Sequence, residues 1–472
     1  MAILWVKVRG LFMYLASKKP IIHFLTNYVT MQDVANMCIA SGGRPIMSDA
    51  SMEFEEIIPK VDGVVINIGT ADQLRFDKMD HAHRIAKAHN KILLLDPVGC
   101  NASRFRLDYC IQSLKNGGIS ILKCNAHEAK ALLNEEISPT FVGVDSQTVM
   151  GEQHHELVRN LWKKFEVYNL ELIVIITGAT DYIASSKGAW ELTGGSVLQQ
   201  RITGTGCMLN SLIITRACAS SMDRHEAILK ALDCMNRSSQ MAAKWIVHQQ
   251  RLGLYKQQLL DEVAKRSAPI YLITQETVDE QTFLYSCMPK TKLALQSGVG
   301  YLQYRVKDKA WEEKLRESRQ LQALAREYGT TFIINDDVRL AKEIGADGVH
   351  LGIQDISIRE ARLELGPNAV VGATAKTIQQ ARCAAKNGAD YLGVGALFSS
   401  PTKKDALPMD LTTLQSIYNH ISLPLYGIGG ITPNLLTQEY TKYLDGVAMV
   451  STIYQEKNEN ITKKIHQIRE NF

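Results

Sequence analysis

The chain has 472 residues, of which 46% are hydrophobic and 22% are charged, and its formal net charge is +4. This length is more than one hydrophobic core usually organises, so we expect two domains. The composition is that of a globular protein, and no basic block marks a nucleic-acid-binding surface. The segment 307–326, which carries both charge signs, is expected to be a solvated helix face.

The nine cysteines form no CxxC pair and no cluster with histidine at metal-ligand spacing. This pattern favours free thiols in a reducing, cytoplasmic compartment. The N-terminal segment 3–16 is apolar, but Lys7 and Arg9 interrupt it and it is shorter than a membrane span. We therefore expect a leading helix there and no membrane partner.

From Ile21 onward, short apolar runs alternate with longer amphipathic stretches, which is typical of a mostly parallel sheet with helices on its faces. After Asp181, shorter alternation interrupted by glycines predicts a small antiparallel extension. Each expected parallel strand ends in a polar or glycine-containing loop, and in open α/β sheets such loops line one crevice. The expected strands span 21–26, 64–68, 92–95, 119–123 and 172–176.

The stretch Thr203–Cys207, which reads TGTGC, precedes an apolar, helix-compatible segment from 208 to 219. Gly204 and Gly206 would lie at a helix N-terminus, where free backbone N–H groups and the helix dipole favour an anion. The alternative is a tight turn with Cys207 in the core, because short glycine motifs are common. Carboxylates in the preceding loops favour the first interpretation, a site for magnesium and nucleotide phosphates.

The segment 20–261 resembles hydroxyethylthiazole kinase, of the ribokinase-like superfamily, on seven motifs taken together. They are LTNYVT at 25–30, PIM at 45–47, NIGT at 67–70, DPVG at 96–99, GVDS at 143–146, TGATDY at 177–182 and TGTGC at 203–207. The resemblance implies a ribokinase-like α/β domain over residues 1–266 that transfers phosphate from ATP to a thiazole alcohol. It also implies a homo-oligomer built on trimers, with sites between subunits.

Site residues follow from the same resemblance. Cys207 would be a modest catalytic base, and the backbone N–H groups of Gly204–Gly206 would contribute more by stabilising charge. Contacts to the thiazole alcohol would come from Asn27, Met47 and Gly204, and contacts to ATP from Lys123 and Thr177.

Four positions depart from the kinase pattern: Lys123 replaces an arginine, Cys124 and Asn101 replace glycines, and His127 replaces a serine. Lysine keeps the positive charge but loses the bidentate fork, so the kinase efficiency is in question rather than the fold. His127 is expected to be a surface or helix-cap residue. The competing hypothesis is a pseudokinase that binds ligand without turning over ATP.

From Pro269 a second strand–helix rhythm begins, and its eight expected strands match the count of a (β/α)8 barrel. Barrel active sites lie at the carboxyl ends of the strands, where this chain carries cations, hydroxyls, glycines and the carboxylates of Asp336 and Asp355. Such a set suits two phosphorylated groups and a magnesium ion, although each residue alone could be a helix cap or a packing residue. His350 is expected to be structural, inside a strand. The expected strands span 270–274, 301–305, 331–335, 348–351, 370–373, 391–394, 423–428 and 446–450.

Residues 269–453 resemble thiamine-phosphate synthase, through QYRVK at 303–307, ND at 335–336, GADGVHLG at 345–352 and PTKKDA at 401–406. The resemblance implies a TIM barrel over residues 267–472 that couples thiazole phosphate to an aminopyrimidine diphosphate and releases pyrophosphate. Asp336 and Asp355 would hold Mg²⁺. The pyrimidine diphosphate would contact Gln303, Tyr304, Arg305, Val306, Lys307, Asn335, Thr374 and Lys403. The thiazole phosphate would contact Ser400, Pro401, Thr402, Gly430, Val450 and Ser451.

The barrel departs mildly from its family, with Val306 for a glutamate, Thr374 for a serine and Ser400 for a threonine. The competing hypothesis is a thiazole tautomerase-like barrel without coupling activity, which the retained Arg305 and Lys403 argue against. Together the two halves predict a bifunctional enzyme of thiamine biosynthesis. In this hypothesis the product of the first half is a substrate of the second.

Overall fold

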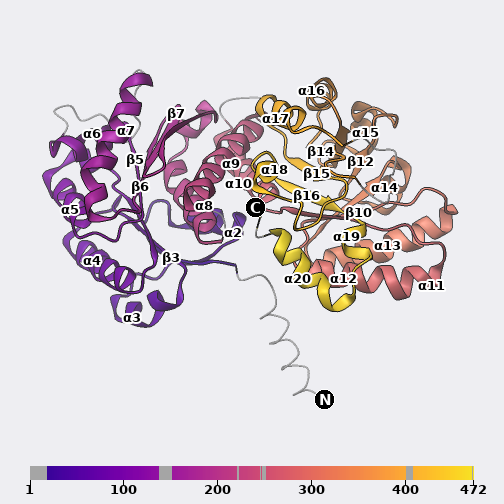
Figure 1. The fold of residues 1–472 in the computed structure, drawn as a ribbon, viewed down its shortest axis with the longest axis horizontal. Helices are drawn as coiled ribbons and strands as arrows, with labels where there is room; N and C mark the ends of the chain where they lie inside the picture. Colours follow the sequence, from indigo (N-terminus) through magenta and orange to yellow (C-terminus); the bar gives the residue numbers. More distant parts are fainter. Residues whose placement is uncertain are drawn as a thin grey trace, which may run out of the picture. The chain divides into compact units, whose positions relative to one another are not determined.

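The computed structural model describes residues 19–137, 151–219, 223–244, 246, 251–399, 408–469 and 471–472. They form two compact units, which we call the first unit (Lys19–Ala264) and the second unit (Lys265–Phe472) (Figure 1). The expected leading helix at 3–16 and the motif at 143–146 lie outside the described residues. Within the described ranges, no helix is both long enough and apolar enough to cross a membrane.

The first unit contains one eight-stranded sheet in the order β2-β1-β3-β4-β5-β6-β7-β8. The predicted antiparallel extension is confirmed, because β7 pairs antiparallel with both β6 and β8. The edge strand β2 (Arg44–Ile46) was not predicted, since it has three residues and one is a proline. The other strands are β1 (Ile21–Leu25), β3 (Gly63–Asn67), β4 (Ile92–Asp96), β5 (Ile121–Asn125), β6 (Ile173–Thr177), β7 (Thr180–Ser185) and β8 (Gly188–Thr193).

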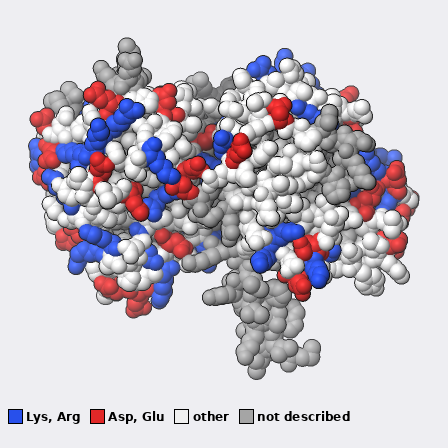
Figure 2. All heavy atoms as spheres, viewed as in Figure 1, with Lys and Arg blue, Asp and Glu red and all other residues white. Residues whose placement is uncertain are grey.

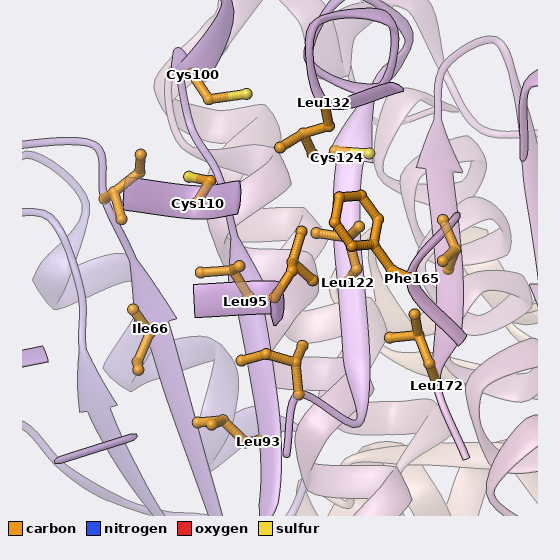
Figure 3. Close-up of a cluster of buried hydrophobic side chains, with 14 of the residues drawn as sticks. Ile66, Leu93, Leu95, Cys100, Cys110, Leu122, Cys124, Leu132, Phe165 and Leu172 are labelled. Carbon is orange, nitrogen blue, oxygen red and sulfur yellow. The ribbon is translucent and has the colours of Figure 1, made fainter. Parts of the chain in front are cut away.

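Helices cover both faces of this sheet, so its strands are apolar on both sides. Leu93 and Leu95 of β4 face one core cluster, while Leu94 between them faces the other. Figure 3 shows Leu95, Leu122 and Phe165 among the buried side chains of the first cluster. The α-helices are α2 (Met31–Ala40), α3 (Phe54–Ile57), α4 (Gln73–Ala88), α5 (Arg104–Lys115), α6 (Ala126–Asn134), α7 (Gly151–Phe165), α8 (Thr205–Ala219), α9 (Arg224–Lys244) and α10 (Leu252–Arg266).

The second unit is a closed barrel of eight parallel strands, so the predicted fold class, an α/β sheet domain followed by a (β/α)8 barrel, is confirmed. Its interior holds a cluster of four tyrosines, Tyr271, Tyr301, Tyr391 and Tyr426. The strands are β9 (Ile270–Ile273), β10 (Tyr301–Tyr304), β11 (Thr331–Asn335), β12 (Gly348–Leu351), β13 (Val370–Ala375), β14 (Tyr391–Gly395), β15 (Leu425–Ile428) and β16 (Gly446–Met449). The helices are α11 (Glu280–Thr282), α12 (Met288–Gln296), α13 (Trp311–Glu327), α14 (Val338–Ile344), α15 (Ile358–Leu365), α16 (Ile378–Lys386), α17 (Leu411–His420), α18 (Gln438–Thr441), α19 (Ser451–Tyr454) and α20 (Asn458–Arg469).

The solvated helix face expected over 307–326 is wrong at two charged positions. Glu317 of α13 is 1% exposed, and its carboxylate pairs with the Lys309 ammonium. The Tyr304 hydroxyl also donates to Glu317 Oε2, at 2.7 Å. These partners explain the burial, because a buried charge needs both a counter-ion and hydrogen bonds. Elsewhere, positive and negative side chains are intermixed across the face shown in Figure 2.

Replacing Phe165 with alanine should lower the free energy of unfolding of the first unit by about 3–5 kcal/mol, because it leaves a cavity in this core. Phe165 is 1% exposed, whereas the nearby Val167 is 70% exposed. Val167→Ala is therefore the matched control and should change the stability by less than about 0.5 kcal/mol. Differential scanning calorimetry measures both variants. Equal shifts in Tm would contradict the core position of Phe165.

Candidate functional site

The TGTGC stretch opens α8 in the first unit, with Thr205 as the first helical residue. Gly204 has φ of +91°, and a Cβ there would lie 2.4 Å from Thr30 Cγ2, so this position requires glycine. Cys207 lies in the first turn and is 8% exposed. The structure thus combines both interpretations of the motif, because a tight turn precedes the helix N-terminus and the thiol is largely buried.

Two asparagines at the carboxyl ends of neighbouring strands hold the Cys207 thiol. Asn27 follows β1 and Asn67 ends β3, and their Nδ2 atoms donate to Cys207 Sγ at 3.3 and 3.2 Å. Burial and the nearby charge of Asp96 raise the pKa of the Cys207 thiol above its ordinary value. The side chain is therefore a protonated thiol at neutral pH.

Asp96, at the end of β4, forms the centre of this cluster. Its Oδ2 accepts from Lys123 Nζ at 3.1 Å, from Asn67 Nδ2 at 2.9 Å and from Asn210 Nδ2 at 2.6 Å. Its Oδ1 is buried and has no hydrogen-bond partner among the described residues. Burial opposes the charge on Lys123, but the neighbouring Asp96, Cys207 and Glu128 leave the pKa of Lys123 raised. Lys123 is therefore a buried ammonium ion, and its Nζ also donates to Gly206 O at 3.2 Å.

Glu128 lies in the first turn of α6 and fixes two loops. Its Oε1 accepts the Gly99 N–H at 2.9 Å, and its Oε2 accepts the Asn125 N–H at 2.8 Å. Burial and the charge of Asp96 raise the pKa of Glu128 to about 7. His127 also lies in this first turn, where its N–H donates to the capping Asn125 side chain.

The other predicted residues of the first unit lie around this cluster. Thr177 ends β6 and pairs in register with Asn125 of β5, the strand that carries Lys123. Met47 directly follows β2 and packs, partly buried, against the core that includes Cys207. Asn210 was missed by the sequence reasoning, although a lone amide in the apolar run 208–219 is a signal for it.

The barrel of the second unit contains a cavity of about 100 Å³. Four of the residues predicted to contact the pyrimidine diphosphate line it, namely Gln303, Arg305, Asn335 and Thr374. Tyr304, another of the predicted contacts, does not line this cavity. Because side chains alternate along β10, Gln303 faces the barrel interior while Tyr304 is directed to Glu317 of α13. Lys307 follows the strand, and its N–H donates to Glu276 Oε1 at 2.8 Å.

Asp336 and Asp355 face each other near this cavity. Asp336 directly follows β11 in a left-handed conformation, with φ of +62°, and its N–H donates to His350 O at 2.9 Å. Asp355 Oδ2 accepts the Gly352 N–H at 2.6 Å. Burial and the neighbouring Asp355 raise the pKa of Asp336 to about 6. Two such carboxylates suit a divalent cation, and no larger group of His, Cys, Asp or Glu in the described part of the chain is arranged to hold a metal ion.

The predicted contacts to the thiazole phosphate are described only in part, because residues 400–403 lie outside the described residues. Gly430 has φ of +60°, and a Cβ there would lie 2.3 Å from Ser399 O. Glycine at position 430 therefore lets the loop after β15 pack closely against the backbone of Ser399. Val450 precedes α19, which begins at Ser451.

His350 was expected to be structural, and it does lie within β12, but its ring lines the cavity. Nε2 lies 3.0 Å from Thr374 Oγ1, and Nδ1 lies 3.1 Å from the Tyr391 hydroxyl. Burial lowers the pKa of His350 to about 4, so the imidazole is neutral at neutral pH. The sequence analysis did not identify the tyrosines or this histidine as cavity-lining residues. Strand periodicity alone does not show which face of each strand lies inside the barrel.

Family models match both units. The model described as the hydroxyethylthiazole kinase family matches residues 12–268, and the model described as thiamine monophosphate synthase matches residues 270–453. The chain is 29% identical over 454 residues to the thiamine biosynthesis bifunctional protein ThiM/ThiE of Symbiobacterium thermophilum, with 92% of each chain covered.

Single-domain relatives match the two halves separately. The chain is 36% identical over 265 residues to the hydroxyethylthiazole kinase of Alkaliphilus metalliredigens, which covers 56% of this chain and 90% of that protein. It is 41% identical over 189 residues to the thiamine-phosphate synthase of Clostridium perfringens, which covers 40% of this chain and 89% of that protein. The chain therefore belongs to the hydroxyethylthiazole kinase family in its first half and to the thiamine monophosphate synthase family in its second, and it is a bifunctional transferase of thiamine biosynthesis.

Proposed function

We propose that the chain catalyses two consecutive reactions. The first unit phosphorylates 4-methyl-5-(2-hydroxyethyl)thiazole with ATP. The second unit couples the thiazole phosphate to hydroxymethylpyrimidine diphosphate, which yields thiamine monophosphate and pyrophosphate. The observation that carries this proposal is that one chain holds a buried Asp96–Lys123 pair beneath the turn before α8 and, separately, a barrel cavity lined by Arg305 and Asn335.

In the first unit the acceptor is a primary alcohol, so catalysis needs alignment and charge stabilisation more than covalent chemistry. We assign the thiazole alcohol to Asn27, Met47 and Gly204, and ATP to Lys123 and Thr177. The N-terminus of α8 would stabilise the charge on the transferring phosphoryl group. Because the pKa of Cys207 is raised, its thiol serves mainly as a partner of two asparagine amides and only weakly as a base.

In the second unit the pyrophosphate leaves first, and the thiazole nitrogen then attacks the pyrimidine methyl cation. Arg305, Asn335, Lys307 and Lys403 would bind the diphosphate, while Gln303 and Thr374 would bind the pyrimidine. Asp336 and Asp355 would hold Mg²⁺, which supplies charge neutralisation for the leaving pyrophosphate. Ser400, Thr402, Gly430 and Ser451 would bind the thiazole phosphate. No general base is required, in keeping with the neutral His350.

We also propose a cytoplasmic homo-oligomer built on trimers of the first unit. None of the nine cysteines, all of which lie among the described residues, forms a disulfide, as is usual in a reducing compartment. Exposed apolar side chains on the loops after β1 and β2 and at the start of α4 support an interface at this edge of the sheet. They are Tyr28, Val29, Met52 and Leu74. Analytical ultracentrifugation measures the assembly, and a monomer at micromolar concentration would contradict it.

The two reactions can be tested separately in one protein. With hydroxyethylthiazole, MgATP and the pyrimidine diphosphate, the wild-type chain should form thiamine monophosphate, and it should do so without ATP when thiazole phosphate is supplied. Asp96→Asn should lower the ATP-dependent rate by about 10²-fold or more and leave the coupling of supplied thiazole phosphate intact, because it removes a central charge of the first site. Asp336→Asn should abolish the formation of thiamine monophosphate in both reactions, with ATP and with supplied thiazole phosphate. Product formation in neither wild-type reaction would contradict the proposal.

Cys207→Ser should lower kcat of the kinase reaction by no more than about tenfold, because general bases that carry catalysis contribute about 10²–10⁴-fold and this thiol is protonated. Serine keeps an acceptor for the amides of Asn27 and Asn67. The measurement is steady-state kinetics with saturating ATP. A loss of more than about 100-fold would make Cys207 the principal base.

The magnesium requirement of the coupling reaction should depend on pH. Asp336 has a pKa of about 6, raised from its ordinary value, so it loses its charge as the pH falls through 6. The Mg²⁺ concentration needed for half-maximal coupling should therefore be about tenfold higher at about pH 5 than at about pH 7, since a protonated carboxyl is a poor ligand. The same concentration at both pH values would exclude Asp336 as a ligand.

A further inference from the structure

One buried histidine of the first unit holds the chain directly after the edge strand β2. His23 of β1 is fully buried, and its Nε2 lies 2.7 Å from the backbone carbonyl oxygen of Ser48. The backbone pairing of β1 with β2 ends at His23 and Ile46, so the chain leaves the sheet at the next residue, Met47. The His23 ring is therefore a side-chain link between β1 and the segment beyond β2, next to the residue assigned to the thiazole alcohol.

The surroundings of this ring define its protonation state. A carbonyl oxygen can only accept, so Nε2 of His23 carries a proton and donates it to Ser48 O. Nδ1 is buried and has no hydrogen-bond partner in the described part of the chain. Burial lowers the pKa of His23 below its ordinary value, although the Ser48 carbonyl and the Glu53 carboxylate oppose this effect. The ring is therefore a neutral imidazole whose one N–H is used on Ser48.

The His23 side chain lies on the face of the sheet that is opposite to the Cys207 thiol. Side chains alternate along β1, and Ile22 and Phe24 belong to the core cluster that contains Cys207. The His23 ring points the other way and packs edge-on against Phe54 of the second cluster, with 5.3 Å between the ring centroids. The histidine therefore acts on the site only through the backbone that it holds.

The residues on either side of Ser48 both make contacts near the candidate site. Met47 packs against the core cluster that contains Cys207. Asp49 Oδ2 accepts a hydrogen bond from the Tyr28 hydroxyl at 3.2 Å, and Tyr28 belongs to the loop after β1 at the edge of the same site. A backbone shift at Ser48 would therefore move Met47 relative to Cys207.

We propose that His23 is a positioning residue for the thiazole alcohol, because its hydrogen bond to Ser48 holds Met47 in place beside the turn before α8. The inference rests on the proposed kinase function and extends it to a residue that does not touch the substrate. Loss of the N–H should weaken the binding of the thiazole but not that of ATP. The residues assigned to ATP, Lys123 and Thr177, lie on β5 and β6, which β3 and β4 separate from β1.

The test measures the steady-state kinetics of hydroxyethylthiazole phosphorylation by the full chain. His23→Leu keeps an apolar side chain in the core but removes the N–H. It should raise the KM for hydroxyethylthiazole about tenfold and change the KM for ATP and kcat by less than about threefold. His23→Gln places an amide N–H near the position of Nε2, so its KM for hydroxyethylthiazole should stay within about threefold of the wild-type value. An unchanged KM in His23→Leu, an equal rise in both variants, or an equal rise in the KM for ATP would overturn the inference.

His83→Leu is the matched control. His83 of α4 is also buried, and its Nε2 lies 2.7 Å from Gly117 O, so this variant loses an equivalent hydrogen bond. Gly117 precedes β5 and therefore lies at the amino edge of the parallel strands, whereas the site lies at their carboxyl edge. His83→Leu should leave the KM for hydroxyethylthiazole unchanged. A rise equal to that of His23→Leu would assign the effect to lost stability and overturn the inference.

Two further measurements do not require turnover. Amide hydrogen exchange of residues 47–53 should be faster in His23→Leu than in the wild-type protein and unchanged in His83→Leu. ¹⁵N NMR of the wild-type protein, with His23 assigned by comparison with His23→Gln, should show the Nε2–H tautomer at neutral pH. The Nδ1–H tautomer, or unchanged exchange in His23→Leu, would overturn the inference. Absence of phosphorylation by the wild-type protein would instead overturn the proposed kinase function, while hydrogen exchange would still decide whether His23 holds this segment.

Discussion

Parallel strand pairing decides which polar side chains meet in both units. Neighbouring parallel strands end at the same edge, so residues that end them are brought into register across the sheet. In the first unit Asn67 is paired with Asp96, and in the second Asn335 is paired with His350. The contacts between the side chains that end these strands depend on the registers, because a shift of one residue would turn the side chains to the opposite face.

The two sites handle charge in opposite ways. In the first unit, Asp96 and Lys123 neutralise each other and are held by two asparagine amides. Such a pair is costly to bury but rigid once its hydrogen bonds are made. In the second unit, burial and then the neighbouring Asp355 raise the pKa of Asp336, so the two carboxylates disfavour each other's charge. The charges of the Asp96–Lys123 pair therefore balance within the protein, whereas the Asp336–Asp355 pair would be stabilised by a bound cation.

Much of the fold was predictable because strands buried on both faces read as continuous apolar runs, and the residues that follow them are polar. The edge strand β2 escaped prediction because three residues with a proline carry no such signal. The ends of strands also identified Asp336, Asn335 and Gln303. The sequence alone could not show which of these side chains contact one another. Tyr271 and Tyr391 are 120 positions apart in the sequence and meet only because the barrel closes. Tyr304 faces outward because side chains alternate along β10 and its neighbour Gln303 faces inward.

The end of α10 has a consequence for the barrel. Arg266, the last residue of this helix, has a fully buried side chain, and its guanidinium donates to Asp445 Oδ1 at 2.8 Å in the second unit. Asp445 also accepts the Leu425 N–H at the start of β15. A catalytic barrel freed by cutting the chain after Arg266 would lose this cation and leave a poorly compensated carboxylate beside β15. Arg266, although it is the last residue of α10, is thus a structural part of the second unit, and a truncated barrel should begin before it.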